Sequence, residues 1–319
     1  MLRAALLALC LLVAHSGLAQ EYPNRVVKIV NPYAAGGPSE AVARVLAEGL
    51  EAHLHQPVIV ESRPGAGTMI GADYVAKAPA DGYTLLLASA ASLIVSPAIQ
   101  PSVPYDAHKD LAPVAMFATV PNLVVVHPSV PAKSIAELID YARAHPGKLN
   151  YASAGVGTGP HLAGELFKRM AHVDLVHVPF KGAAPAIPEL LAGRVQVSFL
   201  NLPPQLAHVR AGKLRALGIA SARRSALLPE VPTVQESGLP GFIIESWNGI
   251  AAPAATPAAV LDTLSRAVGE VMSEAPVKER LQKMGADATP MGREEFAAYV
   301  KADETRLAPI LRTLELKPH

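Results

Sequence analysis

Short apolar runs that are typical of buried strands alternate along this chain with segments of helical periodicity. Helical spacing of apolar residues follows the first run at 42–50 and the fourth at 135–144. Strands separated by helices form parallel sheets with helices on both faces, so this alternation predicts an α/β fold. The strand-like runs are VVKIV at 26–30, PVIV at 57–60, YTLLLA at 83–88, LVVVH at 123–127 and KLNYAS at 148–153.

The alternation restarts once along the 319 residues, a length that suffices for two compact units. Two amphipathic helical segments, at 258–273 and 293–314, then close the chain and are expected to pack on the first unit. We therefore predict two lobes with mixed, mostly parallel sheets and two crossings between them. Lobe 1 comprises 20–121 plus 223–319, and lobe 2 comprises 122–222.

The first 19 residues have the pattern of a secretory signal. Arg3 precedes an unbroken apolar stretch at 4–14, and the small residues Gly17 and Ala19 follow it. This stretch is too short to span a bilayer as a stable helix. We therefore expect export to the periplasm and cleavage after Ala19, which removes the only cysteine, Cys10.

The mature chain is expected to be electrically neutral. The sequence has 28 Lys and Arg against 27 Asp and Glu, and removal of Arg3 with the signal leaves 27 of each. The longest basic run is the pair Arg223-Arg224, so we expect neither nucleic acid nor an anionic membrane as a partner. The sequence has no HExxH or CxxC motif, and we expect a soluble monomer without metal or cofactor.

Glycine-rich turns lead from a strand into a helix at two places, one in each predicted lobe: PYAAGGPSE at 32–40 and YASAGVGTGPHLAGE at 151–165. The first N–H groups of a helix have no partner within it, and the helix dipole favours an anion there. Two such turns that face each other would hold one anionic ligand, and each charge-assisted hydrogen bond contributes roughly 1.5 to 3 kcal/mol. The spacing is equally consistent with two ordinary turns whose glycines only serve packing.

Four other features admit two interpretations each. GAGTMIG at 65–71 suggests a dinucleotide site but misses the GxGxxG spacing of such sites. Ser153 with His161 as base suggests a hydrolase, but the stretch around Ser153 lacks the first glycine of the GxSxG motif. Lys181 either adds positive charge to a cleft or is a solvated lysine. Trp247 fits packing at a hinge or in the core better than stacking on a ligand.

The motifs, taken in order, resemble the substrate-binding receptors of tripartite tricarboxylate transporters, the Bordetella uptake (Bug) family. This resemblance implies a type II periplasmic-binding-protein fold that closes around a dicarboxylate, a tricarboxylate, an acidic amino acid or an aromatic carboxylate and delivers it to membrane transporter subunits. The matching stretches are YPNRVVKIVNPYAAGG, ESRPGAGTMIGADYVAKAPADGYTLLLA, YASAGVGTGPHLAGELF, VPFKGAAPAIPELLAGRVQVSFLNLPP, RSALLPEVPTVQESGLPGF and WNGIAAPAATP.

The resemblance also implies which residues contact the ligand. Two departures matter: Glu40 stands where the family usually has aspartate, and Leu200-Asn201 replaces a common Asp-Asn pair. Loss of that aspartate favours a plain carboxylate over an amine-bearing ligand. The predicted contacts are Tyr33, Ala35, Gly36, Gly37, Ser39, Ser89, Ser92, Ser153, Gly155, Gly157, Thr158, His161, Lys181 and Asn201.

Two non-catalytic functions use the same cleft. The first is a transport receptor for a small organic acid, and the second is a sensory module that presents its closed form to a membrane sensor kinase. Sequence alone does not separate them, since both need the same binding site. We expect no enzymatic activity.

Overall fold

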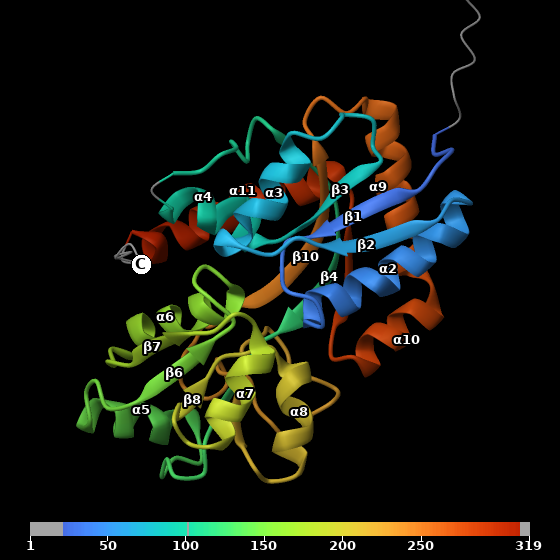
Figure 1. Cartoon of the computed structure of the whole chain (residues 1–319). Helices are drawn as coiled ribbons and strands as arrows, with labels where there is room; N and C mark the ends of the chain where they lie inside the picture. The colour runs from blue at the N-terminus through green and yellow to red at the C-terminus, as the bar shows by residue number, and fades with distance from the viewer. Residues whose placement is uncertain (1–21, 101, 313–319) are drawn as a thin grey trace, which may run out of the picture.

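The computed structural model describes residues 22–100 and 102–312. They form two α/β halves, each built on its own sheet, with a narrow connection between them (Figure 1). The prediction of a two-lobe α/β fold is confirmed. The predicted signal segment 1–19, with its cleavage position, lies outside the described residues.

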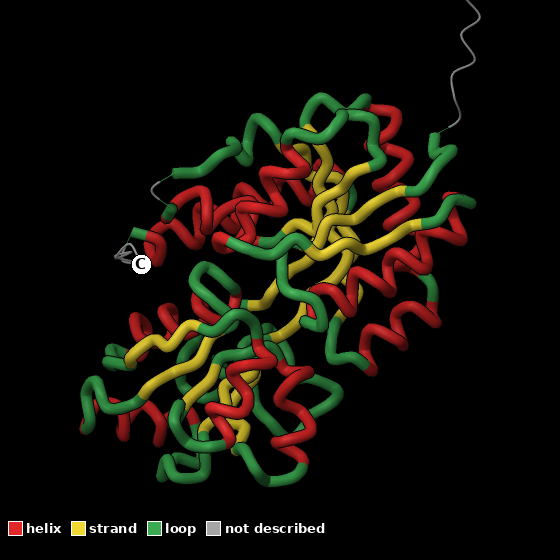
Figure 2. Tube along the Cα trace, viewed as in Figure 1, coloured by secondary structure: helices red, strands yellow, loops and turns green. Residues whose placement is uncertain are grey.

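The first half contains a six-stranded sheet in the order β11-β4-β10-β3-β1-β2. Helices lie on both sides of these strands (Figure 2). The strands are β1 (Val27–Asn31), β2 (Val58–Ser62), β3 (Thr84–Ala88), β4 (Leu111–Pro121), β10 (Glu245–Pro253) and β11 (Asp287–Met291). The helices are α2 (Pro38–Leu54), η1 (Ala66–Thr68), α3 (Met69–Ala76), η2 (Ala91–Val95), α4 (Ser96–Ile99), α9 (Ala258–Ser273), α10 (Ala275–Lys283) and α11 (Arg293–Leu311).

The second half contains a five-stranded sheet in the order β7-β6-β8-β5-β9. Strands β5 and β8 of this sheet are fully buried, as the continuous apolar run of β5 requires. The strands are β5 (Leu123–Val126), β6 (Asn150–Ser153), β7 (Val176–Pro179), β8 (Val197–Ser198) and β9 (Arg215–Ile219). The helices are α5 (Ile135–Ala144), α6 (Gly159–Ala171), α7 (Ala183–Leu191) and α8 (Leu202–Arg210).

Both sheets are mixed, as predicted, but antiparallel pairing is more extensive than the strand-helix alternation indicated. Strand β1 runs parallel to β2 and β3, and β6 runs parallel to β7 and β8. Strands β4, β5 and β10, which lie next to the crossings, make only antiparallel pairs. The strand that carries the chain out of one half lies beside the strand that brings it back, so the two strands run in opposite directions.

The second passage between the halves lies close to Glu245, where β10 begins. The segment between β9 and β10 belongs with the second sheet: the amide of Val234 donates to the carbonyl of Ile219, and the Phe242 ring packs edge-on against Phe167 of α6. These contacts favour a later second crossing than residue 222. The exact lobe boundaries stay a prediction.

A polar cluster, here called the hinge cluster, joins the two crossings. It consists of Asn122, Asn201 and Ser246. The amide Nδ2 of Asn201 donates to Asn122 Oδ1 at 2.8 Å and to Ser246 Oγ at 3.0 Å, and Asn122 Nδ2 donates to the carbonyl of Ile244 at 3.3 Å. The cluster satisfies polar groups that would otherwise be buried without partners where the two chain passages meet.

The C-terminal helices pack as predicted. Helix α9 contacts α2 and β4, and α11 covers the opposite side of β4, so both lie on the first half. Among residues 22–100 and 102–312, no helix combines the length and the apolar character that a membrane crossing requires.

Candidate functional site

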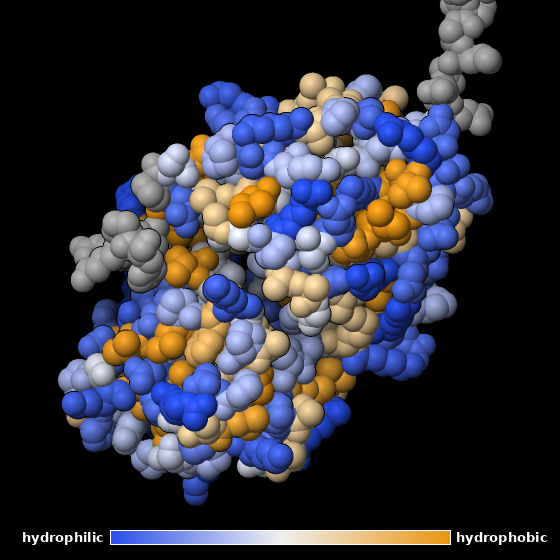
Figure 3. All heavy atoms as spheres, in the orientation of Figure 1, coloured by the Kyte–Doolittle hydropathy of each residue, from blue (hydrophilic) through white to orange (hydrophobic). Residues whose placement is uncertain are grey.

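A cavity of about 640 Å³ lies between the two halves. Its walls come from 32–39, 64–68 and 89–91 of the first half, from 154–162 of the second half, and from 244–247 at the crossing. The surface is hollowed at this position (Figure 3). Most of these wall segments follow the carboxyl ends of parallel strands, where ligands of open α/β sheets bind.

Helix α2 points its N-terminus at one side of this cavity. Gly37 is the N-cap, Pro38 opens the helix, and Ser39 lines the cavity. The first turn of α2 already carries the negative charge of Glu40. Glu40 Oε2 accepts the Gly36 N–H at 2.6 Å, and the other Glu40 oxygen binds Arg44. These hydrogen bonds hold the pKa of Glu40 below its usual value, despite the opposing effect of burial.

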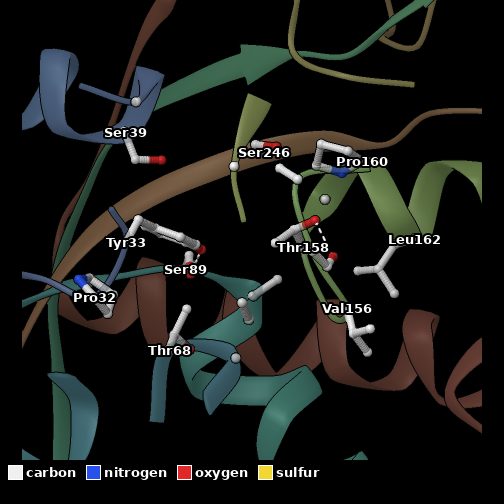
Figure 4. A pocket seen from close by; sticks show the side chains of 18 of the residues that line it. Pro32, Tyr33, Ser39, Thr68, Ser89, Val156, Thr158, Pro160, Leu162 and Ser246 are labelled. Carbon is white, nitrogen blue, oxygen red and sulfur yellow. Dashed lines mark hydrogen bonds between the residues drawn. The ribbon is translucent and has the colours of Figure 1, made fainter. Parts of the chain in front are cut away.

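Helix α6 points its N-terminus at the opposite side, and its first turn carries no acidic residue. The N-cap, Thr158, is buried and lines the cavity, and its Oγ1 donates to the Gly155 carbonyl at 2.7 Å. Ser39 and Tyr33 lie across the cavity from Thr158 (Figure 4). An anion bound here meets an N-terminal dipole that no acidic residue of the helix's own first turn neutralises.

Two stacked imidazoles support the α6 loop from behind. The rings of His161 and His177 lie 4.1 Å apart at 19°. His161 Nδ1 accepts the Gly157 N–H at 3.1 Å, and His177 Nε2 lies 2.7 Å from Ser153 Oγ. Burial lowers the pKa of His161 to about 4 and the pKa of His177 to about 3. At His177 the neighbouring His161 adds to the decrease. Both rings are therefore neutral at pH 7.

The pairing within this group does not support a hydrolase. Ser153 is fully buried and its hydroxyl bonds to His177, whereas His161, the base considered from sequence, is occupied by the Gly157 amide. A nucleophile must reach a substrate carbonyl, and Ser153 does not line the cavity.

The loop at 65–68 forms a wall that the sequence did not indicate. Ala66, Gly67 and Thr68 have φ of 45°, 63° and 86°. Positive φ is rare for a β-branched threonine, and such backbone concentrates at functional sites. Thr68 Oγ1 is buried without a hydrogen-bond partner among the described residues. The GAGTMIG stretch, which misses the dinucleotide spacing, therefore contributes a wall of the cavity.

The structure brings eight of the fourteen predicted contacts to the cavity and leaves six away from it. Ala35 and Gly36 are exposed at the tip of their turn, and Ser92 is buried, where it hydrogen-bonds to the backbone of Ser89. Which of the fourteen touch a ligand stays a prediction. The eight that line the cavity are Tyr33, Gly37, Ser39, Ser89, Gly155, Thr158, Lys181 and Asn201, and the six others are Ala35, Gly36, Ser92, Ser153, Gly157 and His161.

Sequence reasoning missed the contribution of β10 and α11. Glu245 and Ser246 of β10 and Asp303 and Arg306 of α11 line the cavity. No local motif marks them, because they reach the site only when the C-terminal segment packs back on the first half. Among the described residues, no group of three His, Cys, Asp or Glu side chains is arranged to hold a metal ion.

Trp247 is 2% exposed and packs in the core, and it also lines the cavity, so whether it contacts a ligand stays a prediction. Its ring contacts Phe296 and Tyr299 edge-on, and Nε1 donates to Asp303 Oδ2 at 2.9 Å. The indole N–H therefore satisfies one oxygen of a buried carboxylate, while Arg306 satisfies the other.

Replacement of Trp247 by Phe is expected to lower the free energy of unfolding by about 2 to 3 kcal/mol, because a hydrogen bond to a charged group is lost and a cavity is left. Urea denaturation measures the change. The Trp247→Phe/Asp303→Asn double variant should lose less unfolding free energy than the two single variants lose when their losses are summed. Full additivity would contradict the proposed contact.

Comparison with known proteins adds to this geometry. The family model described as "Tripartite tricarboxylate transporter family receptor" matches residues 42–316. BugT of Bordetella pertussis is 37% identical over 295 residues, which cover 92% of this chain and 90% of BugT.

Several solved structures share the fold over nearly the whole chain. R. palustris Rpa4515 with adipate has a TM-score of 0.86 at 34% identity and covers 92% of this chain and 98% of its own. MatC from Rhodopseudomonas palustris with bound malate has a TM-score of 0.82 at 32% identity, with coverage of 91% and 100%. The periplasmic binding protein BugD has a TM-score of 0.82 at 33% identity, with coverage of 91% and 98%. The fold is thus that of periplasmic binding proteins.

Proposed function

Because this chain belongs to the tripartite tricarboxylate transporter receptor family, whose members are periplasmic solute-binding receptors, we propose that it captures a small organic carboxylate between its two halves. The carboxylate is then delivered to membrane transporter subunits. Export through the signal at 1–19, with cleavage after Ala19, places the receptor in the periplasm.

The observation that carries this proposal is the α6 N-terminus at the cavity wall, across from α2. The α6 start offers unpaired backbone donors and a dipole, and its first turn has no competing acidic side chain. Several charge-assisted hydrogen bonds of roughly 1.5 to 3 kcal/mol each give useful affinity for one carboxylate. The anionic end of the ligand therefore binds at the Gly159 N–H, beside Thr158, whose own N–H and hydroxyl donate to the Gly155 carbonyl.

The remaining walls suit the carbon skeleton of a small acid. Val156, Leu162 and Phe180 contribute apolar surface, and the cavity volume of about 640 Å³ is in the range of small-molecule sites. Two relatives have been solved with adipate and with malate, which supports a dicarboxylate as the first class to test. Tricarboxylates and aromatic acids are the next classes.

A thermal-shift panel of the mature protein with dicarboxylates, tricarboxylates and aromatic acids tests the proposal. A ligand at 100 times its dissociation constant stabilises the folded protein by about 2.7 kcal/mol, so a true ligand raises the melting temperature by several degrees. Neutral amides of the same acids serve as controls. A flat response to every anion would count against carboxylate capture.

A further inference from the structure

Glu245 places an acidic side chain in the wall of a cavity that we assign to an anion. It is the first residue of β10, opposite Pro121 of β4, where the chain passes between the halves. It is partly buried and lines the cavity beside Ser246. A carboxylate at this position repels a second anionic group of the ligand, so its presence needs an explanation.

The Glu245 carboxyl makes no hydrogen bond or ion pair with another side chain among the described residues. The nearby guanidinium of Arg306 is already engaged, since Nε donates to Asp303 Oδ1 at 3.0 Å and Nη1 donates to the Ile243 carbonyl at 3.1 Å. Burial and the charge of Asp287 on β11 raise the pKa of Glu245, and the charge of Arg223 only partly opposes them. The carboxylate form is therefore poorly stabilised in the unliganded protein.

A carboxylate that lines a cavity without a protein partner, and whose ionised form burial disfavours, is a candidate for ligand contact. We propose that Glu245 is a specificity-determining residue that accepts a hydrogen bond from a hydroxyl or ammonium group of the bound carboxylate. The receptor then selects acids that carry a hydrogen-bond donor over unsubstituted acids of the same length. This inference rests on the proposed function.

One small molecule can reach both groups. The backbone of Gly159, at the start of α6, lies against Ser246, the neighbour of Glu245: a Cβ added to Gly159 would lie 2.4 Å from Ser246 Oγ. Gly159 and Glu245 both line this cavity, so one small ligand can place its carboxylate at the α6 N-terminus and its donor group at Glu245. This proposal differs from the plain carboxylate expected from residue 40, because it assigns the acceptor of the donor group to β10.

Isothermal titration of matched ligand pairs tests the inference. Suitable pairs are succinate with malate, glutarate with 2-hydroxyglutarate, and propionate with alanine. In at least one pair, the wild type is expected to bind the substituted member about 10-fold or more tightly, since a hydrogen bond to a charged acceptor contributes roughly 1.5 to 3 kcal/mol. Glu245→Ala should remove this preference and strengthen binding of the unsubstituted dicarboxylate.

Two further variants make the result specific. Glu245→Gln keeps an acceptor oxygen without the charge, so it should retain part of a hydroxyl preference and lose an ammonium preference. Glu51→Ala, which removes an exposed carboxylate from α2, should leave every affinity unchanged. Melting curves without ligand confirm that each variant is folded.

The outcomes separate this inference from the proposed function. Tight binding of acids without any preference for a donor group, or a preference that survives Glu245→Ala, overturns the role of Glu245 and leaves the receptor function intact. No binding of any acid by the folded wild type contradicts carboxylate capture and, with it, this inference.

Discussion

Thr158→Asp is expected to weaken carboxylate binding by about 1,000-fold. The new carboxylate at the N-cap of α6 would lie near the anionic end of the ligand, and two like charges about 4 Å apart repel by about 4 kcal/mol at an effective dielectric constant of 20. Aspartate is a preferred N-cap residue and suits the helix dipole, so the unliganded protein should melt no earlier than the wild type. Titration calorimetry with the best acid from the panel measures the loss.

Thr158→Asn is the matched control, because asparagine has the size of aspartate and caps helices equally well but carries no charge. It should keep affinity within about 10-fold of the wild type, with the difference reflecting the hydrogen bond to Gly155. Equal affinities of the Asp and Asn variants would show that the α6 N-terminus does not hold the anion.

The second large effect is a loss of stability in mild acid. The folded pKa values of His161 and His177, about 4 and about 3, both lie below the ordinary value of about 6.5. The unfolded chain therefore binds protons that the folded protein does not, and stability that is present above pH 6.5 is lost as the pH falls towards 4. Between pH 6.5 and 4.5 each histidine accounts for about 2 to 3 kcal/mol.

Urea denaturation at several pH values measures this loss, and a double variant isolates its cause from carboxylate titration. In His161→Asn, the side-chain oxygen replaces Nδ1 as the acceptor for Gly157, and in His177→Gln it replaces Nε2 beside Ser153. The double variant should be markedly less sensitive to acid. His172→Asn, at an exposed left-handed C-cap that asparagine tolerates, is the control. A double variant as acid-sensitive as the wild type would refute the assignment.

The regular elements were predictable from the sequence because their apolar periods are strong. Helices at 135–144 and 258–273 have the predicted bounds, and all five strand-like runs are strands within about two residues. Helix α10 was not predicted, because Leu281 is its only buried residue and a single position defines no period. The segment 220–244 has no regular element, so nothing local indicates which half it packs on.

The site was predictable only where glycine-rich turns lead into helices. Those turns are local, and Ser39 and Thr158 lie at the cavity as expected. Glu245 and Arg306 come from segments far along the chain, and only tertiary packing brings them to the cavity. Ser153 and His161 have residue types that suggest chemistry, yet both are buried behind the loop that they support.

The Glu40 carboxylate at the start of α2 has a kinetic consequence. An approaching anion is attracted to the α6 tip, whereas at the α2 tip it meets a carboxylate that Arg44 balances. The encounter complex should therefore form on the second half, and the first half should act afterwards as a cover that delays escape. On this account, changes in the α6 turn alter the association rate and its dependence on ionic strength, and changes in the α2 turn alter residence time.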